Sequence, residues 1–218
     1  MLDWQIFRGL PESELRRLVP VARRRRFERR EVVFHQGDPA DTLHLVSQGH
    51  FAARIGTRLG DTTTLSVHGP GEAFGELAIV EPDSVRSTTV AALEASETYA
   101  VHYTDFGRLR RQYPSVNDLL VGLLARRLRR SGDLLAEALF VSAETRVRRR
   151  LLEVAELYPD GVVPLRQEDL AGLAGTSRAT VNRVLRAEAA RGTLELGRGK
   201  TVVLDAGALA RRAASPLL

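Results

Sequence analysis

The chain has 218 residues, of which 44% are hydrophobic and 27% are charged, a composition typical of a soluble protein with one large or two modest domains. It has no cysteine, which excludes disulfides, thiolate-held metals and cysteine-ligated iron–sulfur clusters. No apolar run approaches the length of a membrane span, and the first residues lack the apolar core of a signal peptide. We therefore expect a cytoplasmic protein with no membrane partner.

The charge is unevenly distributed along the chain. Residues 1–105 carry 12 arginines and 15 acidic residues, whereas residues 142–218 carry 12 arginines, one lysine and 9 acidic residues. A polyanion is therefore expected to bind the C-terminal part. We interpret the run of four arginines at 23–26 as a solvated stretch that leads into a strand beside Glu28 and Glu31, not as a nucleic-acid patch.

The N-terminal part is predicted to be one helix followed by β-structure. The helix begins near Ser13, because Leu15, Leu18 and Val19 follow at helical spacing. Turn signals such as Gln36-Gly37-Asp38-Pro39 then separate six short β-prone runs, at 32–34, 43–46, 51–55, 63–67, 87–91 and 98–102. Short strands at this spacing predict a sandwich or a barrel-like roll.

One stretch of this β-region suits a ligand that carries both a phosphate and a sugar hydroxyl. Gly75-Glu76-Leu77 is followed ten residues after Glu76 by Arg86-Ser87-Thr88. A guanidinium offers a planar fork of donors to phosphate oxygens. A carboxylate can only accept hydrogen bonds, so Glu76 suits a ribose hydroxyl.

Beyond residue 103 the pattern becomes helical. Thr104-Asp105 can cap a short helix at 106–113, and Ser115 can cap a long one that ends near residue 140. The long helix carries an apolar stripe at helical spacing, which includes Val116, Leu120, Leu124, Leu128 and Leu135. We expect this stripe to pair with a second copy of the chain as a parallel coiled coil.

The last part reads as a helix-turn-helix with a wing. A hinge at 141–143, with Ser142 as N-cap, precedes a helix at 144–157 and a strand at 162–165. Helices at 167–173 and 177–191 flank a turn at Gly175, with Ser177 as the second N-cap. A hairpin formed by 194–196 and 201–204 encloses Gly197-Arg198-Gly199-Lys200. The alternative is an ordinary pair of packed surface helices with solvated arginines.

The exposed face of the second helix suits DNA. Arg178 and Arg183 could each bind a guanine O6/N7 pair in the major groove. Thr176, Ser177 and Thr180 could hold phosphates, and Lys200 could bind the backbone from the wing. Ala179 and Asn182 lie on the same predicted face.

From about residue 7 to residue 204, these features together resemble the catabolite activator family, which comprises cyclic-AMP receptor proteins and fumarate–nitrate regulators. The most specific motifs are Phe74-Gly75-Glu76-Leu77-Ala78 with Arg86-Ser87, Ala125-Arg126-Arg127-Leu128, and the segment from Gly175 to Arg183. The resemblance implies an α+β fold: a cyclic-nucleotide-binding β-roll (1–113), a dimerisation helix with its hinge (114–141) and a winged helix-turn-helix domain (142–218).

The cyclic-AMP-responsive branch is the most similar, and it implies roles for individual residues. Arg86 and Ser87 would hold the cyclic phosphate, near the backbone of Gly75 and near Thr88. Glu76 would accept a hydrogen bond from the ribose 2′-hydroxyl, and Leu77 completes the motif. Arg127 and Ser131 would complete the nucleotide pocket. The implied ligand is cAMP and the implied partners are a second copy and near-palindromic double-stranded DNA. RNA polymerase is a further candidate partner.

Two positions depart from the family pattern. Gly132 stands where a hydroxyl would reach the adenine from the partner subunit, so cAMP is not selected over cGMP by the sequence. Ala179 replaces the usual Glu of the recognition helix and can only touch a thymine methyl. We therefore expect altered preference at one base pair per half-site, by about 1–3 kcal/mol.

Three alternatives stay open. The chain could be a constitutive DNA-binding regulator that keeps Glu76 and Arg86 as a structural ion pair. A haem sensor would need a ligand such as His35, His44 or His68, which we interpret instead as turn or surface residues. An enzyme is disfavoured, because no metal-spaced cluster, phosphate-binding loop or nucleophile–base pair is evident.

Overall fold

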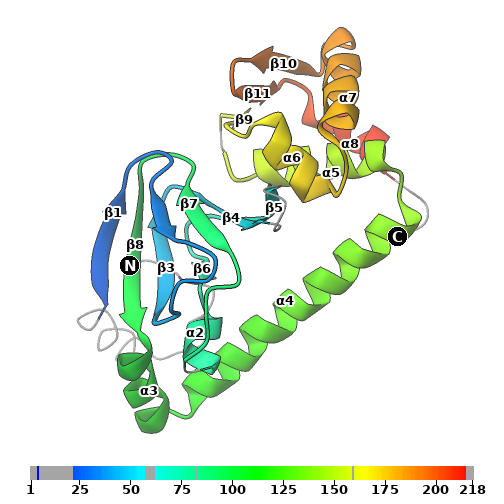
Figure 1. The fold of residues 1–218 in the computed structure, drawn as a ribbon. Coiled ribbons are helices and arrows are strands. Elements are labelled where there is room, and N and C mark those ends of the chain that lie inside the picture. Colours follow the sequence, from blue (N-terminus) through cyan, green and yellow to red (C-terminus); the bar gives the residue numbers. More distant parts are fainter. Residues whose placement is uncertain (1–3, 5–21, 57–61, 82, 159, 215–218) are drawn as a thin grey trace. The chain divides into compact units, whose positions relative to one another are not determined.

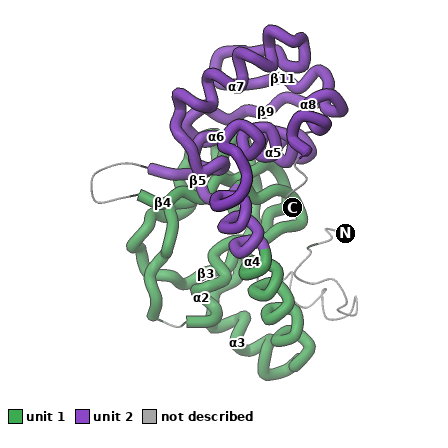
Figure 2. Tube along the Cα trace, turned by 90° about the vertical axis from the view of Figure 1, so that its right-hand side faces the viewer, with its two compact units in different colours: residues 1–56, 67–129 green, residues 57–66, 130–218 purple. Residues whose placement is uncertain are grey.

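The computed structural model describes residue 4 and residues 22–56, 62–81, 83–158 and 160–214. The chain divides into two compact units, one drawn from residues 1–56 and 67–129 and the other from residues 57–66 and 130–218 (Figure 2). The helix predicted near Ser13 lies outside the described residues. Among the described helices, none combines the length and apolarity needed to cross a membrane.

Two antiparallel sheets build the roll that the sequence predicts (Figure 1). The first has the order β1-β8-β3-β6, from β1 (Arg23–Phe27), β8 (Ser96–His102), β3 (Thr42–Gln48) and β6 (Ala73–Phe74). The second has the order β2-β7-β4-β5, from β2 (Val32–Phe34), β7 (Thr89–Ala92), β4 (Phe51–Gly56) and β5 (Thr62–His68).

The central strand β3 is buried on both faces, because successive side chains of a strand point to opposite sides. Its Val46 joins a cluster between the two sheets that includes Phe51 and Phe74. Its Leu43 and Leu45 join a second cluster with residues of α3 (Tyr103–Gln112) and α4 (Ser115–Phe140). The roll therefore has an inner core and a helix-covered outer face.

The arginine run at 23–26 forms strand β1 itself and does not merely precede a strand. The antiparallel register places Arg26 opposite Glu97 on β8. The Glu97 carboxylate forms ion pairs with Arg24, at 2.6 Å, and with Arg26, at 3.3 Å. The sequence pattern did not point to Glu97, because this carboxylate lies 71 residues from Arg26 and only the sheet brings the two side chains together.

Three helical features differ from the prediction. Helix α3 begins at Tyr103, and its N-cap is His102, whose Nδ1 accepts from the Thr104 N–H at 3.3 Å. The cap at Thr104-Asp105 is therefore wrong, because β8 leads directly into the helix. The four-residue α2 (Leu77–Val80) and the C-terminal α8 (Ala206–Ala213) were not predicted, since each is too short for a clear periodic signal.

The second unit contains the winged helix-turn-helix. It comprises α5 (Ala143–Ala155), α6 (Gln167–Ala174), α7 (Arg178–Ala190) and α8, with a sheet of order β10-β11-β9. The strands are β9 (Val162–Val163), β10 (Leu194–Gly197) and β11 (Lys200–Val203). The Ser142 cap of α5 is confirmed, because its Oγ accepts from the Thr145 N–H at 3.2 Å.

Arg146 connects the hinge to the turn of the helix-turn-helix. Its Nη1 donates to the Val141 carbonyl at 2.6 Å, its Nε to the Ala174 carbonyl at 2.8 Å and its Nη2 to the Gly175 carbonyl at 3.0 Å. The last carbonyls of a helix lack partners within it and attract a cation. One guanidinium thus ties the start of α5 to the end of α6.

Glu188 joins three helices of the second unit. It is fully buried on α7 and accepts hydrogen bonds from Arg148 on α5, at 2.8 Å, and from Thr193, at 2.9 Å. Arg212 on α8 pairs with the same carboxylate. Burial alone would raise the pKa of Glu188, but the bonds from Arg212, Arg148 and Thr193 lower this pKa to about 2.

We predict that Glu188→Gln lowers the free energy of unfolding at pH 7 by about 3 kcal/mol, because it removes the buried carboxylate that pairs with the partly buried guanidinium groups of Arg148 and Arg212. The folded pKa lies below the ordinary value of 4.5. The wild type therefore loses this stabilisation as the pH falls from 4.5 to about 2, and the difference between the proteins shrinks over that window. Urea unfolding at several pH values measures this difference in the free energy of unfolding between the wild type and the variant. The exposed Glu195→Gln is the control, and a difference that does not change with pH contradicts the assignment.

Candidate functional site

Gly75 sits at a turn where only glycine fits. Its φ of +79° lies in the left-handed region, which L side chains rarely adopt. A Cβ atom there would lie 2.7 Å from Nη1 of Arg86 and 2.9 Å from the carbonyl oxygen of Thr42. The turn therefore brings the backbone of Gly75 against the Arg86 guanidinium.

The Arg86 guanidinium is buried and held from several sides. The side chain is 4% exposed. Its Nη1 donates to the Thr42 carbonyl at 2.8 Å, and its Nη2 donates to Thr42 Oγ1 at 2.7 Å and to Asp41 Oδ1 at 3.2 Å. The Phe34 ring covers the group, with its centroid 4.1 Å from Cζ. These contacts fix the guanidinium plane.

The same group retains an unused donor. Nε of Arg86 is buried and has no hydrogen-bond partner within the described part of the chain. Burial lowers the pKa of Arg86, and Asp41 raises it in opposition. A buried unsatisfied donor on a cation is costly, so it marks a position where an anionic oxygen can bind. Phosphate oxygens fit this donor set.

Glu76 directly follows Gly75 in the chain, but its carboxylate pairs with a different arginine, Arg127. Its carboxylate is buried, and Oε1 accepts from Nη1 of Arg127 on α4 at 2.7 Å. Arg127 also donates from Nη2 to the Ala73 carbonyl at 2.6 Å. The hypothesis of an ion pair between Glu76 and Arg86 is therefore wrong, since each has a different partner.

The remaining predicted nucleotide-binding residues are more accessible. Leu77, Ser87 and Ser131 are exposed, and Thr88 is half-buried. No atom would contact a Cβ placed on the neighbouring Gly132 within 4 Å. The structure thus groups Gly75 with Arg86 and Glu76 with Arg127. Sequence reasoning missed Phe34, Asp41 and Thr42, because they lie more than 40 residues from Arg86 and carry no local motif.

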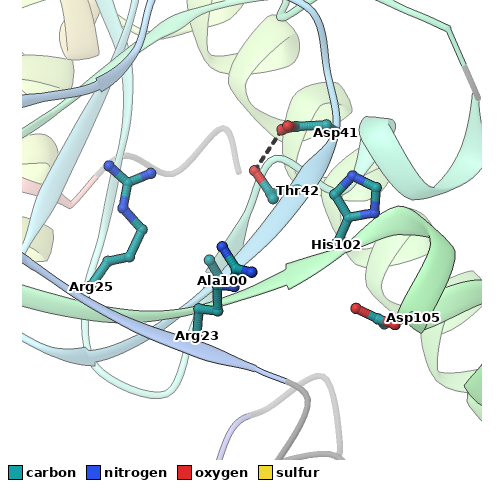
Figure 3. Close-up of a pocket in the computed structure, with 7 residues that line it drawn as sticks. All are labelled: Arg23, Arg25, Asp41, Thr42, Ala100, His102 and Asp105. Carbon is teal, nitrogen blue, oxygen red and sulfur yellow. Dashed lines mark hydrogen bonds between the residues drawn. The ribbon is translucent and has the colours of Figure 1, made fainter.

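A separate pocket of about 410 Å³ lies on the roll (Figure 3). None of the predicted nucleotide-binding residues lines it. It shares Asp41 and Thr42 with the Arg86 contacts, and the two are joined by a hydrogen bond of 3.0 Å from Thr42 Oγ1 to Asp41 Oδ1. Its other lining residues are Arg23, Arg25, Ala100, His102 and Asp105.

Within the described ranges, no group of three or more His, Asp or Glu side chains is placed so that it could hold a metal ion. The interpretation of His44 as a turn or surface residue is wrong. It is 1% exposed and stacks on Phe74 at 5.0 Å, and burial lowers its pKa to about 3. His68 is also buried, 3.7 Å from Glu72, whereas His35 is exposed.

The helix-turn-helix has the predicted caps. Gly175 has a φ of +58° and ends α6, and Ser177 Oγ accepts from the Thr180 N–H at 3.2 Å to start α7. Arg178, Ala179 and Arg183 are exposed on α7. Thr176 and Asn182 are half-buried, and Lys200 is exposed in the β10–β11 hairpin.

Both predicted base-contacting arginines are in ion pairs. Nη1 of Arg183 lies 2.6 Å from Oε1 of Glu144 on α5, and Nη1 of Arg178 lies 3.2 Å from Oε1 of Glu168 on α6. Sequence reasoning missed both acids, since they belong to other helices. The face that these side chains form remains solvent-accessible.

Two protein families match this chain. Residues 24–113 match the cyclic nucleotide-binding domain family, and residues 145–212 match the Crp-like helix-turn-helix domain family. The cyclic AMP receptor protein of Thermus thermophilus is 36% identical over 207 residues, which cover 94% of each chain. The chain belongs to the catabolite activator family.

Other members of the catabolite activator family are similar over nearly the whole chain. The CRP-like cAMP-activated global transcriptional regulator of Mycobacterium tuberculosis is 34% identical over 220 residues, covering 95% of this chain and 96% of its own. The crystal structure of the Thermus thermophilus catabolite activator protein has a TM-score of 0.57 at 35% identity, and covers 96% of this chain and 98% of its own.

More distant structures share the fold alone. FixK2 of Bradyrhizobium japonicum has a TM-score of 0.76 at 22% identity, and covers 89% of this chain and 98% of its own. Together these matches show a DNA-binding transcription regulator with a cyclic nucleotide-binding domain, and not an enzyme. The α+β fold predicted from the sequence is confirmed.

We predict that Gly75→Ala destabilises the first unit by about 1–3 kcal/mol, because it adds both backbone strain and a clash with Arg86. Gly199→Ala is the matched control: its φ of +72° is similar, but a Cβ there meets nothing within 4 Å. Thermal unfolding of both variants separates the clash from the strain. Equal losses in the two variants would show that the close approach to Arg86 is unimportant.

Proposed function

We propose that this protein is a homodimeric, sequence-specific transcription regulator that is controlled allosterically by cAMP. The observation that carries the proposal is the buried Arg86 guanidinium with a free Nε donor against the Gly75 turn. The division into roll (1–113), dimerisation helix with hinge (114–141) and winged domain (142–218), and a cytoplasmic location, belong to the same proposal.

The cyclic phosphate binds at Arg86. Nε donates to a phosphate oxygen, and the exposed Ser87 hydroxyl and the Gly75 backbone add donors, with Thr88 at the edge. Hydrogen bonds from a cation to an anion are about twice as strong as neutral ones. Because Phe34, Thr42 and Asp41 already fix the guanidinium plane, little side-chain entropy is lost on binding.

The sugar and base bind toward α4. The ribose 2′-hydroxyl donates to Oε2 of Glu76, because Arg127 donates to the other carboxylate oxygen, Oε1. Ser131, which is one helical turn beyond Arg127, offers a hydroxyl to the adenine. The names of the Thermus and Mycobacterium relatives, which are both called cyclic-AMP proteins, support cAMP as the ligand.

Dimerisation uses the exposed apolar residues of α4, because Val116 and Leu120 of the predicted stripe are instead buried in a core cluster of the roll. Val121, Leu128 and Leu135 recur every seven residues and are 63%, 75% and 63% exposed. A seven-residue apolar repeat packs two helices as a coiled coil. The hinge at 141–143 then sets the spacing of two recognition helices, and a two-fold dimer calls for half-sites about 34 Å apart.

DNA binds the exposed face of α7. Arg178 and Arg183 contact bases, Thr176, Ser177 and Thr180 bind phosphates, and Ala179 and Asn182 lie between them. Lys200 binds the backbone from the wing. RNA polymerase is the partner through which the bound dimer would act on transcription.

We predict that calorimetry detects cAMP binding to the wild type and that Arg86→Leu weakens this binding at least about tenfold, because charge-assisted bonds are lost. Ser87→Ala, at an exposed position, should weaken it about threefold or more without affecting folding. No heat from the wild type, or equal affinities for all three proteins, contradicts the proposal.

A ligand-independent regulator is the second candidate. The observation in its favour is that protein groups already pair with Glu76 and with two nitrogens of Arg86. It requires an affinity for DNA that is the same with and without cAMP at fixed salt, and a steep salt dependence from phosphate contacts. A DNA titration with and without cAMP therefore separates the two candidates.

We predict that Leu128→Glu raises the dissociation constant of the dimer on the order of 100-fold, because it places two unpaired carboxylates in an apolar seam. Arg129→Glu is the control, since Arg129 is exposed on α4 but lies outside the repeat. Sedimentation velocity measures the association. A dimer that tolerates Leu128→Glu as well as it tolerates the control would place the interface elsewhere.

A further inference from the structure

The arginines of helix α7 form ion pairs with carboxylates of two neighbouring helices, α5 and α6. The first turn of α7 contains no acidic residue, and Ala179 offers no carboxylate. Glu144 in the first turn of α5 and Glu168 in the first turn of α6 reach the two arginines instead. Each pair joins two helices of the same unit.

The geometry leaves these arginines able to bind a base. Each ion pair uses Nη1, and a guanidinium carries five N–H donors. Binding a guanine O6/N7 pair needs two of these donors. Both arginine side chains are 67% exposed, so their remaining donors are open to a ligand.

The same pairs oppose binding to phosphate alone. Non-specific affinity for DNA comes from phosphate neutralisation, which depends on net positive charge. A carboxylate beside the guanidinium cancels this charge and repels a phosphate, whereas hydrogen bonding to a base edge depends mainly on direction. The carboxylate also limits the directions that the arginine can take.

We propose that Glu144 and Glu168 are specificity-determining residues that restrain Arg183 and Arg178 and thereby suppress non-specific DNA binding. This inference rests on the proposed function of α7 as the recognition helix. Exposed ion pairs are weak, so each carboxylate should change affinity by about two- to fivefold. The pair of Glu144 is the shorter, at 2.6 Å, and provides the sharper test.

The test compares full-length Glu144→Gln with the wild type in the presence of cAMP. One duplex is selected by the wild type from a random-sequence library, and the other is an unrelated duplex of equal length. Both are titrated over a series of salt concentrations. Glu156→Gln is the matched control: Glu156 caps the other end of α5, is exposed, and has no ion pair within the described ranges.

We expect Glu144→Gln to raise non-specific affinity about two- to fivefold and specific affinity less, so that their ratio falls. The non-specific salt slope should steepen by up to about one unit as Arg183 gains a phosphate. In an Arg183→Ala background, Glu144→Gln should change neither affinity beyond the Glu156→Gln control, because its partner is gone.

Three results overturn the inference. The ratio of specific to non-specific affinity could stay unchanged in Glu144→Gln, or it could change equally in the Glu156→Gln control. The change in affinity could also persist in the Arg183→Ala background. A wild type that selects no sequence from the library refutes the proposed function, and the inference with it. Selection by the wild type with an unaltered ratio in Glu144→Gln refutes the inference alone.

Discussion

Placing the Arg86 guanidinium in the interior of the roll is the constraint on which the first unit depends. A buried cation is tolerated only where other groups replace its hydration. Thr42 and Asp41 supply acceptors from the start of β3, and Phe34 on β2 supplies an aromatic face. Gly75 must lack a side chain for the group to fit. One charge therefore constrains residues in three separate segments of the chain.

Arginines are used in the same way throughout the molecule. Arg127 binds Glu76 and a backbone carbonyl, Arg146 binds carbonyls of the hinge and of the turn, and Arg148 binds the buried Glu188. Each of these arginines makes at least one bond to an element that is distant in the chain. A planar fork with five donors suits such junctions better than the single ammonium of lysine. The described junctions between elements thus share one chemistry, a guanidinium that donates to several acceptors.

Sequence patterns predicted the elements well where the signal was local. Strand β2 was predicted with its observed bounds, and the Ser142 and Ser177 caps are confirmed, because a cap is a bond between neighbours in the chain. The pattern failed at His44, which looked like a surface residue but stacks in the core. Only the pairing of β3 with β6 brings Phe74 to that ring.

The sequence by itself determined most of the longer elements and their order, the glycine turns, and the side chains whose chemistry suits phosphate, a sugar hydroxyl or bases. These follow from short-range periodicity and from the chemistry of each side chain. The tertiary structure alone decided the partners: Asp41 and Thr42 for Arg86, Arg127 for Glu76, Glu144 for Arg183. Charged groups pair with whichever counter-charge the folded chain brings within about 4 Å, and that distance bears no relation to separation along the sequence.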